Sequence, residues 1–378
     1  MLLTKGLEIE QYTGLKNGQV LPLSALISQN LKDFTIEPDQ RNIEFVTGIT
    51  KSYDELLASA IGQRWKLRDF LSKQNPEWTV VPSSILALPF EKEFIFSKPE
   101  DPYHQHISQK HGLSVITTSI HYNLGLDNPE EIIRIVNLLR LEGPLTLALS
   151  AASPFYDGKF TGNQSERWLS FPKVPQFIPF FSSHQDFIDW THEQLKSGEM
   201  FNIRHFWSSV RPNGASRPEK IDRLEIRIAD INTEWKTIMA ITAWLELRTL
   251  YFLHKEPDLK ADSKDLSLID LTEENEKLAA IQGLSSHFSD WINENEDTSF
   301  KSIENRLPEL YDLAKELGIQ EIMKPHFETI EGILTNGNEA QQKIALYDQG
   351  LSVEEIVENW VQESLDEDTK ILNSISAR

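Results

Sequence analysis

The segment Arg223-Leu-Glu-Ile-Arg-Ile228 alternates strictly between charged and aliphatic side chains. This period of two predicts a β-strand, because successive side chains of a strand point to opposite faces of its sheet. The aliphatic side chains would pack against the core, whereas Arg223, Glu225 and Arg227 would share the other face. Taken alone, the segment is typical of an antiparallel strand with one solvated face.

Three segments nearer the N-terminus, residues 6–11, 42–46 and 114–123, show the same alternation. If all four strands belong to one sheet, its polar face gathers several carboxylates, a histidine and two arginines: Glu8, Glu10, Glu44, Glu225, His121, Arg223 and Arg227. Asn123 lies on the same face of its strand as His121. Carboxylates at short range repel one another, so a cluster of this size is not expected on a face that contacts only solvent.

Divalent cations would remove this repulsion between the carboxylates. Oxygen ligands select Mg²⁺ or Mn²⁺, and a histidine can complete such a site. The neighbouring Arg223 and Arg227 would suit an anion that the metal also holds, of which a polyphosphate is the obvious case. The polar face therefore indicates a site for a metal-bound polyphosphate.

The composition of the chain is that of an ordinary globular protein. Its 378 residues are 39% hydrophobic and 25% charged, which is enough for a large core. No apolar segment of the secretory type precedes Glu8, and Glu246 and Arg248 interrupt the most apolar helical stretch, so we expect a cytoplasmic protein without a membrane span. Cysteine is absent, which excludes disulfides, thiolate metal sites and catalytic thiols in this chain.

The net charge of −21 argues against nucleic acid or an anionic membrane as the main partner. The charge is uneven, however. Residues 203–227 contain six basic and three acidic side chains, whereas residues 256–300 contain three basic and twelve acidic ones. A locally basic segment in an acidic protein is suited to an anionic substrate, although a solvated loop and strand would have the same composition.

Local patterns predict an α+β fold with a largely antiparallel sheet, because helices and strands do not simply alternate along the chain. The expected helices cover residues 52–73, 128–141, 183–196 and 233–254, and the further expected strands cover residues 79–81, 145–150 and 224–228. Gly143-Pro144 is expected to end the second helix. The long loops 151–182 and 207–219 are expected to be functional.

From residue 256 onward the sequence predicts polar, acidic helices, including residues 310–317 and 322–334 and a helix that begins with a capping box at Ser352 and Glu355. We expect a catalytic core in residues 1–255 and a helical region in residues 256–378 that packs on this core.

Several common motifs are absent from the sequence. The chain has no complete phosphate-binding P-loop. It also lacks a Gly-x-Gly-x-x-Gly, which would indicate a dinucleotide-binding fold, and a Gly-x-Ser-x-Gly, which would indicate a serine hydrolase. His104, His106 and His111 lie close together in sequence, but no carboxylate or thiol partner has matching spacing. We interpret them as ordinary polar histidines of a loop.

Five motifs follow one another along the chain: Leu7-Glu-Ile-Glu10, Ile36-Glu37 with Ile43-Glu-Phe-Val-Thr-Gly48, Ile120-His-Tyr-Asn123, Leu149-Ser-Ala-Ala-Ser-Pro-Phe155 and Arg223-Leu-Glu-Ile-Arg-Ile-Ala-Asp230. Together they resemble the glutamate–cysteine ligase superfamily, and within it the branch found in cyanobacteria. The resemblance covers about residues 5–255. It implies a curved, mainly antiparallel sheet that forms a funnel-shaped active site flanked by helices, as in glutamine synthetase.

The resemblance also implies a reaction and its cofactors. ATP and Mg²⁺, or Mn²⁺, would serve to join L-glutamate to L-cysteine through a γ-glutamyl phosphate, which is the first step of glutathione biosynthesis. The roles that the resemblance implies are metal binding by Glu8, Glu10, Glu37, Glu44 and Glu225, cofactor binding by His121, Asn123 and Arg211, substrate binding by Arg167 and Arg223, and catalysis by Arg227 and Glu225. Arg227 would meet the transferred phosphoryl group.

Some branches of the superfamily carry a second histidine where this chain has Asn123, which leaves the amine substrate open. Three alternatives remain at this stage. The chain could be a ligase of the same architecture that uses another amine, a metal-dependent phosphohydrolase, or a non-enzymatic interaction protein built on the acidic C-terminal helices. The sequence does not predict the oligomeric state.

Overall fold

The computed structural model describes residues 2–255, 266–291 and 296–376. Its main feature is a sheet of seven strands, all paired antiparallel, in the order β2-β3-β1-β5-β9-β8 with β4 paired to the second half of β1. The strands are β1 (Lys5–Leu15), β2 (Phe34–Ile36), β3 (Asn42–Val46), β4 (Trp78–Val81), β5 (Ile120–Gly125), β8 (Val210–Asn213) and β9 (Arg223–Ile226). The four strands that the alternation predicts are therefore neighbours in one sheet.

Helices make up most of the rest of the described chain. They are α1 (Ser24–Asn30), α2 (Tyr53–Gln74), α3 (Pro102–His111), α4 (Pro129–Ser150), α5 (Glu166–Ser170), α6 (His184–Ser197), α7 (Trp235–Lys255), α8 (Leu266–Gln282), α9 (Ser299–Glu316), α10 (Gln320–Asn336), α11 (Glu339–Asp348) and α12 (Val353–Ser376). Short 3₁₀ turns cover Gly112–Val115, Ile203–His205 and Gly283–Ser285, and two small hairpins are formed by β6 (Phe155–Tyr156) with β7 (Lys159–Phe160) and by β10 (His287–Ser289) with β11 (Glu296–Thr298).

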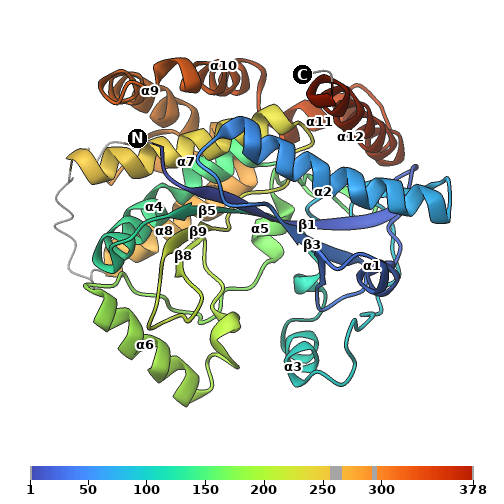
Figure 1. The fold of residues 1–378 in the computed structure, drawn as a ribbon, viewed down its shortest axis with the longest axis horizontal. Helices are drawn as coiled ribbons and strands as arrows, with labels where there is room; N and C mark the ends of the chain where they lie inside the picture. The colour runs from blue at the N-terminus through green and yellow to red at the C-terminus, as the bar shows by residue number, and fades with distance from the viewer. Residues whose placement is uncertain (1, 256–265, 292–295, 377–378) are drawn as a thin grey trace.

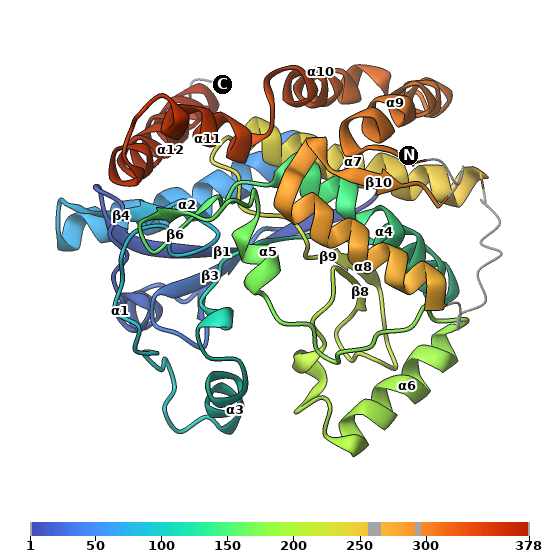
Figure 2. The same ribbon diagram turned by 180° about the vertical axis from the view of Figure 1, so that it is seen from behind.

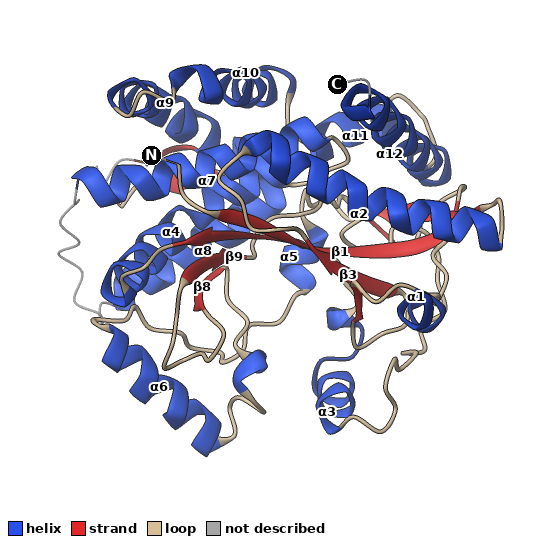
Figure 3. Ribbon diagram, viewed as in Figure 1, coloured by secondary structure: helices blue, strands red, loops and turns tan. Residues whose placement is uncertain are grey.

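The helices divide between the two sides of the sheet. Figures 1 and 3 show α2 and α7 across one side, with α9 to α12 beyond them, whereas α3 and α6 lie on the other side. Seen from behind, α8 lies beside α4 (Figure 2). The aliphatic face of the sheet, including Leu7, Ile43 and Leu224, is buried in one large core with side chains of α2 and α7. The polar face points toward the side on which α3 and α6 lie.

The structure confirms some expected elements and corrects others. The helices expected over residues 52–73, 183–196 and 233–254 are α2, α6 and α7, with ends shifted by one or two residues. The strand expected over residues 145–150 is wrong, because α4 continues through Pro144 to Ser150. A continuous apolar run fits a buried strand and a buried helix equally well. Residues 132–150 are almost entirely buried, and this packing outweighs the backbone hydrogen bond that Pro144 cannot make.

The strand expected over residues 114–123 is also shifted. Only its last residues are in β5, which continues to Gly125, while Gly112–Val115 forms a 3₁₀ turn. The segment of residues 223–228 forms β9 up to Ile226, and the Arg227 N–H donates to the carbonyl of Ser209 beyond the end of the strand.

Buried ion pairs attach the C-terminal helices to the rest of the chain. The Asp368 carboxylate of α12 is fully buried and accepts hydrogen bonds from Arg64 and Arg68 of α2 and from the indole of Trp235. Arg306 of α9 pairs in the same way with Glu142 of α4, 2.9 Å away. The helices therefore pack on the core. The expected boundary at residues 255 and 256 adjoins residues 256–265, which lie outside the described residues. No helix in the described part of the chain has the length and apolarity to cross a bilayer.

Candidate active site

The register of the sheet brings the predicted polar side chains together. In the pairing of β1 with β3, Glu10 lies opposite Glu44, and in the pairing of β1 with β5, Glu8 lies opposite His121. Glu225 of β9 lies opposite Asn123 of β5 on one side and Arg211 of β8 on the other. Residues opposite one another in neighbouring strands point to the same face. The sheet itself thus places these groups on one face, in neighbouring rows.

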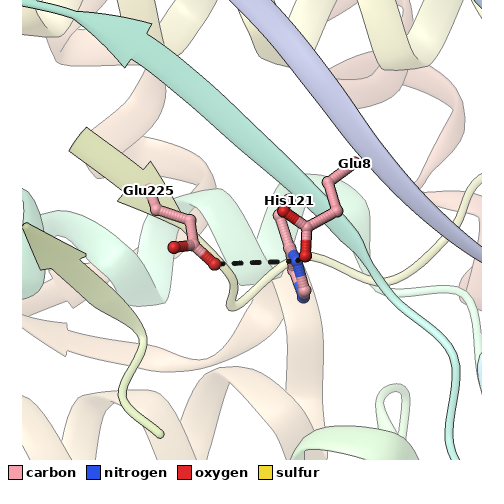
Figure 4. Close-up of side chains that lie close together, drawn as sticks. All are labelled: Glu8, His121 and Glu225. Carbon is pink, nitrogen blue, oxygen red and sulfur yellow. Dashed lines mark hydrogen bonds and ion pairs between the residues drawn. The ribbon is translucent and has the colours of Figure 1, made fainter. Parts of the chain in front are cut away.

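Glu8, His121 and Glu225 form the first of two candidate ligand groups, with one ligand atom of each lying within 4.8 Å of the others. Figure 4 shows the three side chains converging from different strands. The Nδ1 atom of His121 is 2.9 Å from Glu8 Oε1 and 3.7 Å from Glu225 Oε1. On the other side of the ring, Nε2 is 2.9 Å from the hydroxyl of Ser119.

Both carboxylates of this group are held ionised. Burial would raise the pKa of Glu225, but the guanidinium groups of Arg211 and Arg227 hold it well below its usual range. Burial also opposes ionisation of Glu8, but the electrostatic attraction and hydrogen bond of His121 lower the pKa of Glu8 to about 2. The first group therefore presents two negative charges around one imidazole.

Glu10, Glu37 and Glu44 form the second candidate ligand group, whose oxygen atoms lie within 4.8 Å of one another. Glu37 comes directly after β2. Burial and the neighbouring Glu10 raise the pKa of Glu37 to about 8. Burial, Glu8 and Glu37 raise the pKa of Glu44 well above its usual range. Within the described residues, no basic side chain forms an ion pair with Glu37 or Glu44.

This donor set fits a divalent cation. Three carboxylates in contact repel one another unless they take up protons or share a cation. Mg²⁺ and Mn²⁺ prefer oxygen ligands of this kind, and a histidine such as His121 is an acceptable further ligand. Both groups could therefore hold a metal ion. One ligand of the second group, Glu37, comes from the motif Ile36-Glu37, which does not show the alternation of the strands.

Two arginines surround Glu225. Arg211 makes two hydrogen bonds to its carboxylate, of 2.8 and 2.9 Å, and Asn213 donates to the same carboxylate. Arg227 donates to Glu225 Oε1 over 2.6 Å, and its Nη1 lies 3.4 Å from His121 Nδ1. The Nε atom of Arg227 is buried without a hydrogen-bond partner. Arg227 thus lies at the first carboxylate group with hydrogen-bonding capacity to spare.

One cavity of about 730 Å³, counting its open mouth, is bordered by Arg227 and by every member of the two ligand groups except Glu225, which is fully buried. The remaining wall comes from outside the sheet and includes Tyr103, Phe171, Arg204 and Trp207. The cavity thus combines an acidic floor with an aromatic wall that carries one further arginine.

The structure does not bring every expected residue to this cavity. Arg223 donates to Asn123 over 3.2 Å and to Asp222, and neither Arg223 nor Asn123 borders the cavity. Arg223 lies one step along the polar face beyond Glu225, and Asn123 lies directly opposite Glu225.

Arg167 is buried and does not border the cavity. It donates to Asp230 over 2.7 Å and to the carbonyls of Arg227 and Ile228. The Asp230 carboxylate holds this guanidinium beneath the loop that follows β9, so the contact with a substrate anion that the resemblance implies has no support in this geometry.

The histidines interpreted as loop residues are on a helix, α3, which begins after the capping side chain of Asp101. His111 Nε2 lies 3.2 Å from Nε2 of His205, a residue that the sequence analysis did not single out. The Phe201 N–H donates to His205 Nδ1, so the proton of a neutral His205 is on Nε2 and points to His111. A metal ion on this pair is disfavoured, because Nδ1 of His205 accepts a hydrogen bond and would have to carry the proton.

This histidine pair predicts a pH dependence of stability. Burial lowers the pKa of His111 to about 4, with help from Lys110, and burial and His111 lower the pKa of His205 to about 3, from an ordinary value of 6.5. Between pH 6.5 and 4 the unfolded chain therefore binds more protons, and the free energy of unfolding falls as the pH is lowered. We expect the free energy of unfolding, measured with urea, to fall less between pH 7 and pH 5 in the double variant His111→Gln/His205→Gln than in the wild type. An equal loss in both proteins would contradict this assignment.

The sequence model of glutamate–cysteine ligase family 2 matches residues 4–363. The chain belongs to this family.

Relatives and solved structures agree with this assignment. The chain is 25% identical over 325 residues to a protein of Gloeobacter violaceus that carries the name "Putative glutamate–cysteine ligase 2", covering 84% of this chain and 83% of that one. A protein of the same name from Solibacter usitatus is 28% identical over 249 residues, 65% of this chain and 61% of that one.

Among solved structures, the glutamate–cysteine ligase of Francisella tularensis in complex with AMP has a TM-score of 0.72 at 14% identity, covering 97% of this chain and 89% of that one. A bifunctional glutathione synthetase from Pasteurella multocida has a TM-score of 0.74 at 17% identity, covering 98% of this chain and 52% of that one. These likenesses confirm the expected fold class.

Proposed function

We propose that this chain is an ATP- and Mg²⁺-dependent ligase that forms γ-glutamylcysteine from L-glutamate and L-cysteine. The observation that carries the proposal is that Arg227 and both carboxylate groups, apart from the buried Glu225, border one cavity. Membership of glutamate–cysteine ligase family 2 supports the reaction class, and the AMP complex of the Francisella protein supports use of a nucleotide.

The reaction must first activate a carboxylate, because an amine does not displace hydroxide from a carboxylate in water. A γ-carboxylate oxygen of glutamate attacks the γ-phosphorus of ATP, a new O–P bond forms, and the bond to the bridging oxygen breaks to release ADP. The cysteine nitrogen then attacks the acyl carbon of the γ-glutamyl phosphate. A C–N bond forms as the C–O bond to phosphate breaks.

The residues of this chain mainly position charge for the first step. Divalent cations, when bound, would supply positive charge for the phosphate oxygens. Glu8, His121 and Glu225 would hold one such cation, and Glu10, Glu37 and Glu44 another. Arg227 would donate to the oxygens of the transferred phosphoryl group, where donors fixed in advance stabilise the developing charge.

Other residues of the site keep these groups in place. Arg211 holds Glu225 by two hydrogen bonds, which leaves Arg227 free to turn its remaining donors toward the cavity. The aromatic wall of Phe171 and Trp207 would exclude water from the acyl phosphate, since bulk water would otherwise hydrolyse it.

ADP release with Mg²⁺-ATP and glutamate tests this function. Cysteine is expected to stimulate ADP formation far more than alanine, 2-aminobutyrate or putrescine, and the product should be γ-glutamylcysteine by mass spectrometry. Strong stimulation by another amine would assign a ligase of the same fold with a different acceptor. ADP formation without any amino acid would identify a phosphohydrolase and contradict the proposal.

A further inference from the structure

Arg204 is an arginine of the cavity that has no assigned role so far. It lies in the 3₁₀ turn Ile203–His205, its side chain is exposed, and it borders the cavity from outside the sheet. Its guanidinium carbon lies over the ring of Tyr103, 5.4 Å from the ring centre. Within the described residues, the Arg204 side chain forms no ion pair with a carboxylate.

The other two arginines of the cavity differ from Arg204 in this respect. Arg211 and Arg227 both donate to the Glu225 carboxylate, so each already has a carboxylate partner in the chain. Arg204 instead uses the ring face of Tyr103, which attracts a cation without neutralising it. Arg204 also attracts the Glu37 carboxylate without forming an ion pair with it, so the hydrogen-bond donors of its guanidinium stay available to a bound anion.

The backbone that carries Arg204 is fixed by several contacts. The side chain of Asn202 accepts from the Arg204 N–H over 2.9 Å, and Arg217 donates to the carbonyl of Ile203 over 2.6 Å. His205, the next residue, contacts His111 of α3, and α3 also carries Tyr103. A cation held on a fixed turn and a fixed ring loses little freedom when it binds an anion.

The position of Arg204 is suited to a particular part of the substrates. A substrate amino acid reacts through one group but also carries an α-carboxylate, and the cations at the floor of the cavity would already be shared between its carboxylates and the polyphosphate. The α-carboxylate needs a cation away from the reacting end. The planar guanidinium of an arginine matches a carboxylate with two parallel hydrogen bonds.

We propose that Arg204 binds the α-carboxylate of an amino-acid substrate at the wall of the cavity opposite the sheet strands. This inference rests on the proposed function, because it takes the substrates to be amino acids. Glutamate and cysteine both carry an α-carboxylate, and the experiment below shows which of the two amino acids supplies the carboxylate that Arg204 binds. Tyr103 acts as a positioning residue, since its ring supports the guanidinium.

Steady-state kinetics of Arg204→Ala test the proposal, with Arg204→Lys as a conservative variant. Lys220→Ala is the matched control, because Lys220 is an exposed cation of the same basic segment that does not border the cavity. Loss of a hydrogen bond to a charged group predicts an increase of about 10–100-fold in the KM of one amino acid, with a smaller change in kcat. Lys220→Ala should leave both KM values as in the wild type, and Arg204→Lys should be intermediate.

Analogues without the α-carboxylate identify the source of the anion. γ-Aminobutyrate is glutamate without its α-carboxylate, and cysteamine is cysteine without its carboxylate. If Arg204 binds glutamate, the Arg204→Ala change raises the KM of glutamate and leaves the inhibition constant of γ-aminobutyrate unchanged. If Arg204 binds cysteine, the change raises the KM of cysteine and leaves the inhibition constant of cysteamine unchanged. An unchanged KM for both amino acids, or an increase in the KM of ATP alone, would overturn the proposal.

Calorimetry separates a failure of this inference from a failure of the proposed function. If the wild type forms no ADP with any amine, the proposed function fails, and binding of glutamate and of cysteine is then measured with Mg²⁺ and a non-hydrolysable ATP analogue. Binding by the wild type that is lost in Arg204→Ala supports the inference. Equal binding by both proteins, or no binding by the wild type, overturns it.

Discussion

Replacing Arg227 with alanine is expected to lower kcat/KM for ligation by about 10²–10³-fold, the usual effect of losing one donor that stabilises transition-state charge. Its guanidinium borders the cavity beside His121 and Glu225. The fold should survive, because Glu225 keeps its two hydrogen bonds from Arg211. Amine-dependent ADP release measures the rate, and the urea midpoint measures the fold.

Arg227→Lys is the informative companion of this variant. A lysine keeps the charge but not the planar set of donors, so its rate should lie between those of the wild type and Arg227→Ala. Ligation by Arg227→Ala at the wild-type rate would remove Arg227 from the mechanism.

Replacing Glu225 with alanine is expected to cost stability as well as activity. The Glu225 side chain is fully buried, and its partner Arg211 is only 7% exposed. Without the carboxylate, Arg211 remains as a buried charge with no counter-ion, which typically costs about 3–5 kcal/mol. The free energy of unfolding from urea titrations should fall by this amount, and ligation should be lost with it.

Glu225→Gln provides the control for this second prediction. The amide keeps an acceptor oxygen and the volume of the side chain. The Glu225→Gln variant should therefore have a larger free energy of unfolding than Glu225→Ala, while it still fails to catalyse ligation. A free energy of unfolding for Glu225→Ala within about 0.5 kcal/mol of the wild type, the range of ordinary surface substitutions, would contradict the ion pair described here.

Much of the site could be predicted because it is built from strands. The period of two shows which side chains share a face, and Glu8, Glu44, His121 and Glu225 all follow it. The alternation does not show how deeply each carboxylate is buried, so it does not distinguish Glu225, which also supports the fold, from the more accessible Glu8.

Residues outside the strands gave weaker signals. Arg204 and Trp207 lie outside the predicted strands, and the signals for that region were the excess of basic side chains in residues 203–227 and the long loop 207–219. The direction of Arg167 depends on Asp230, 63 positions away in sequence, and no local pattern indicates this pairing. Residues 145–150 are all buried and mostly apolar, so their sequence could not distinguish a strand from a buried helix.

The central claim is that the polar face of the sheet holds divalent cations on Glu8, His121 and Glu225 and on Glu10, Glu37 and Glu44. Titration of the protein with Mn²⁺, followed by the electron paramagnetic resonance signal of the free ion, tests it directly. The wild type should bind Mn²⁺ in competition with Mg²⁺, and Glu10→Gln/Glu44→Gln should bind at least about tenfold more weakly, by analogy with the loss of metal-site partners. Glu321→Gln, at an exposed position of α10, should bind as the wild type does. Equal binding by the wild type and Glu10→Gln/Glu44→Gln would contradict the account.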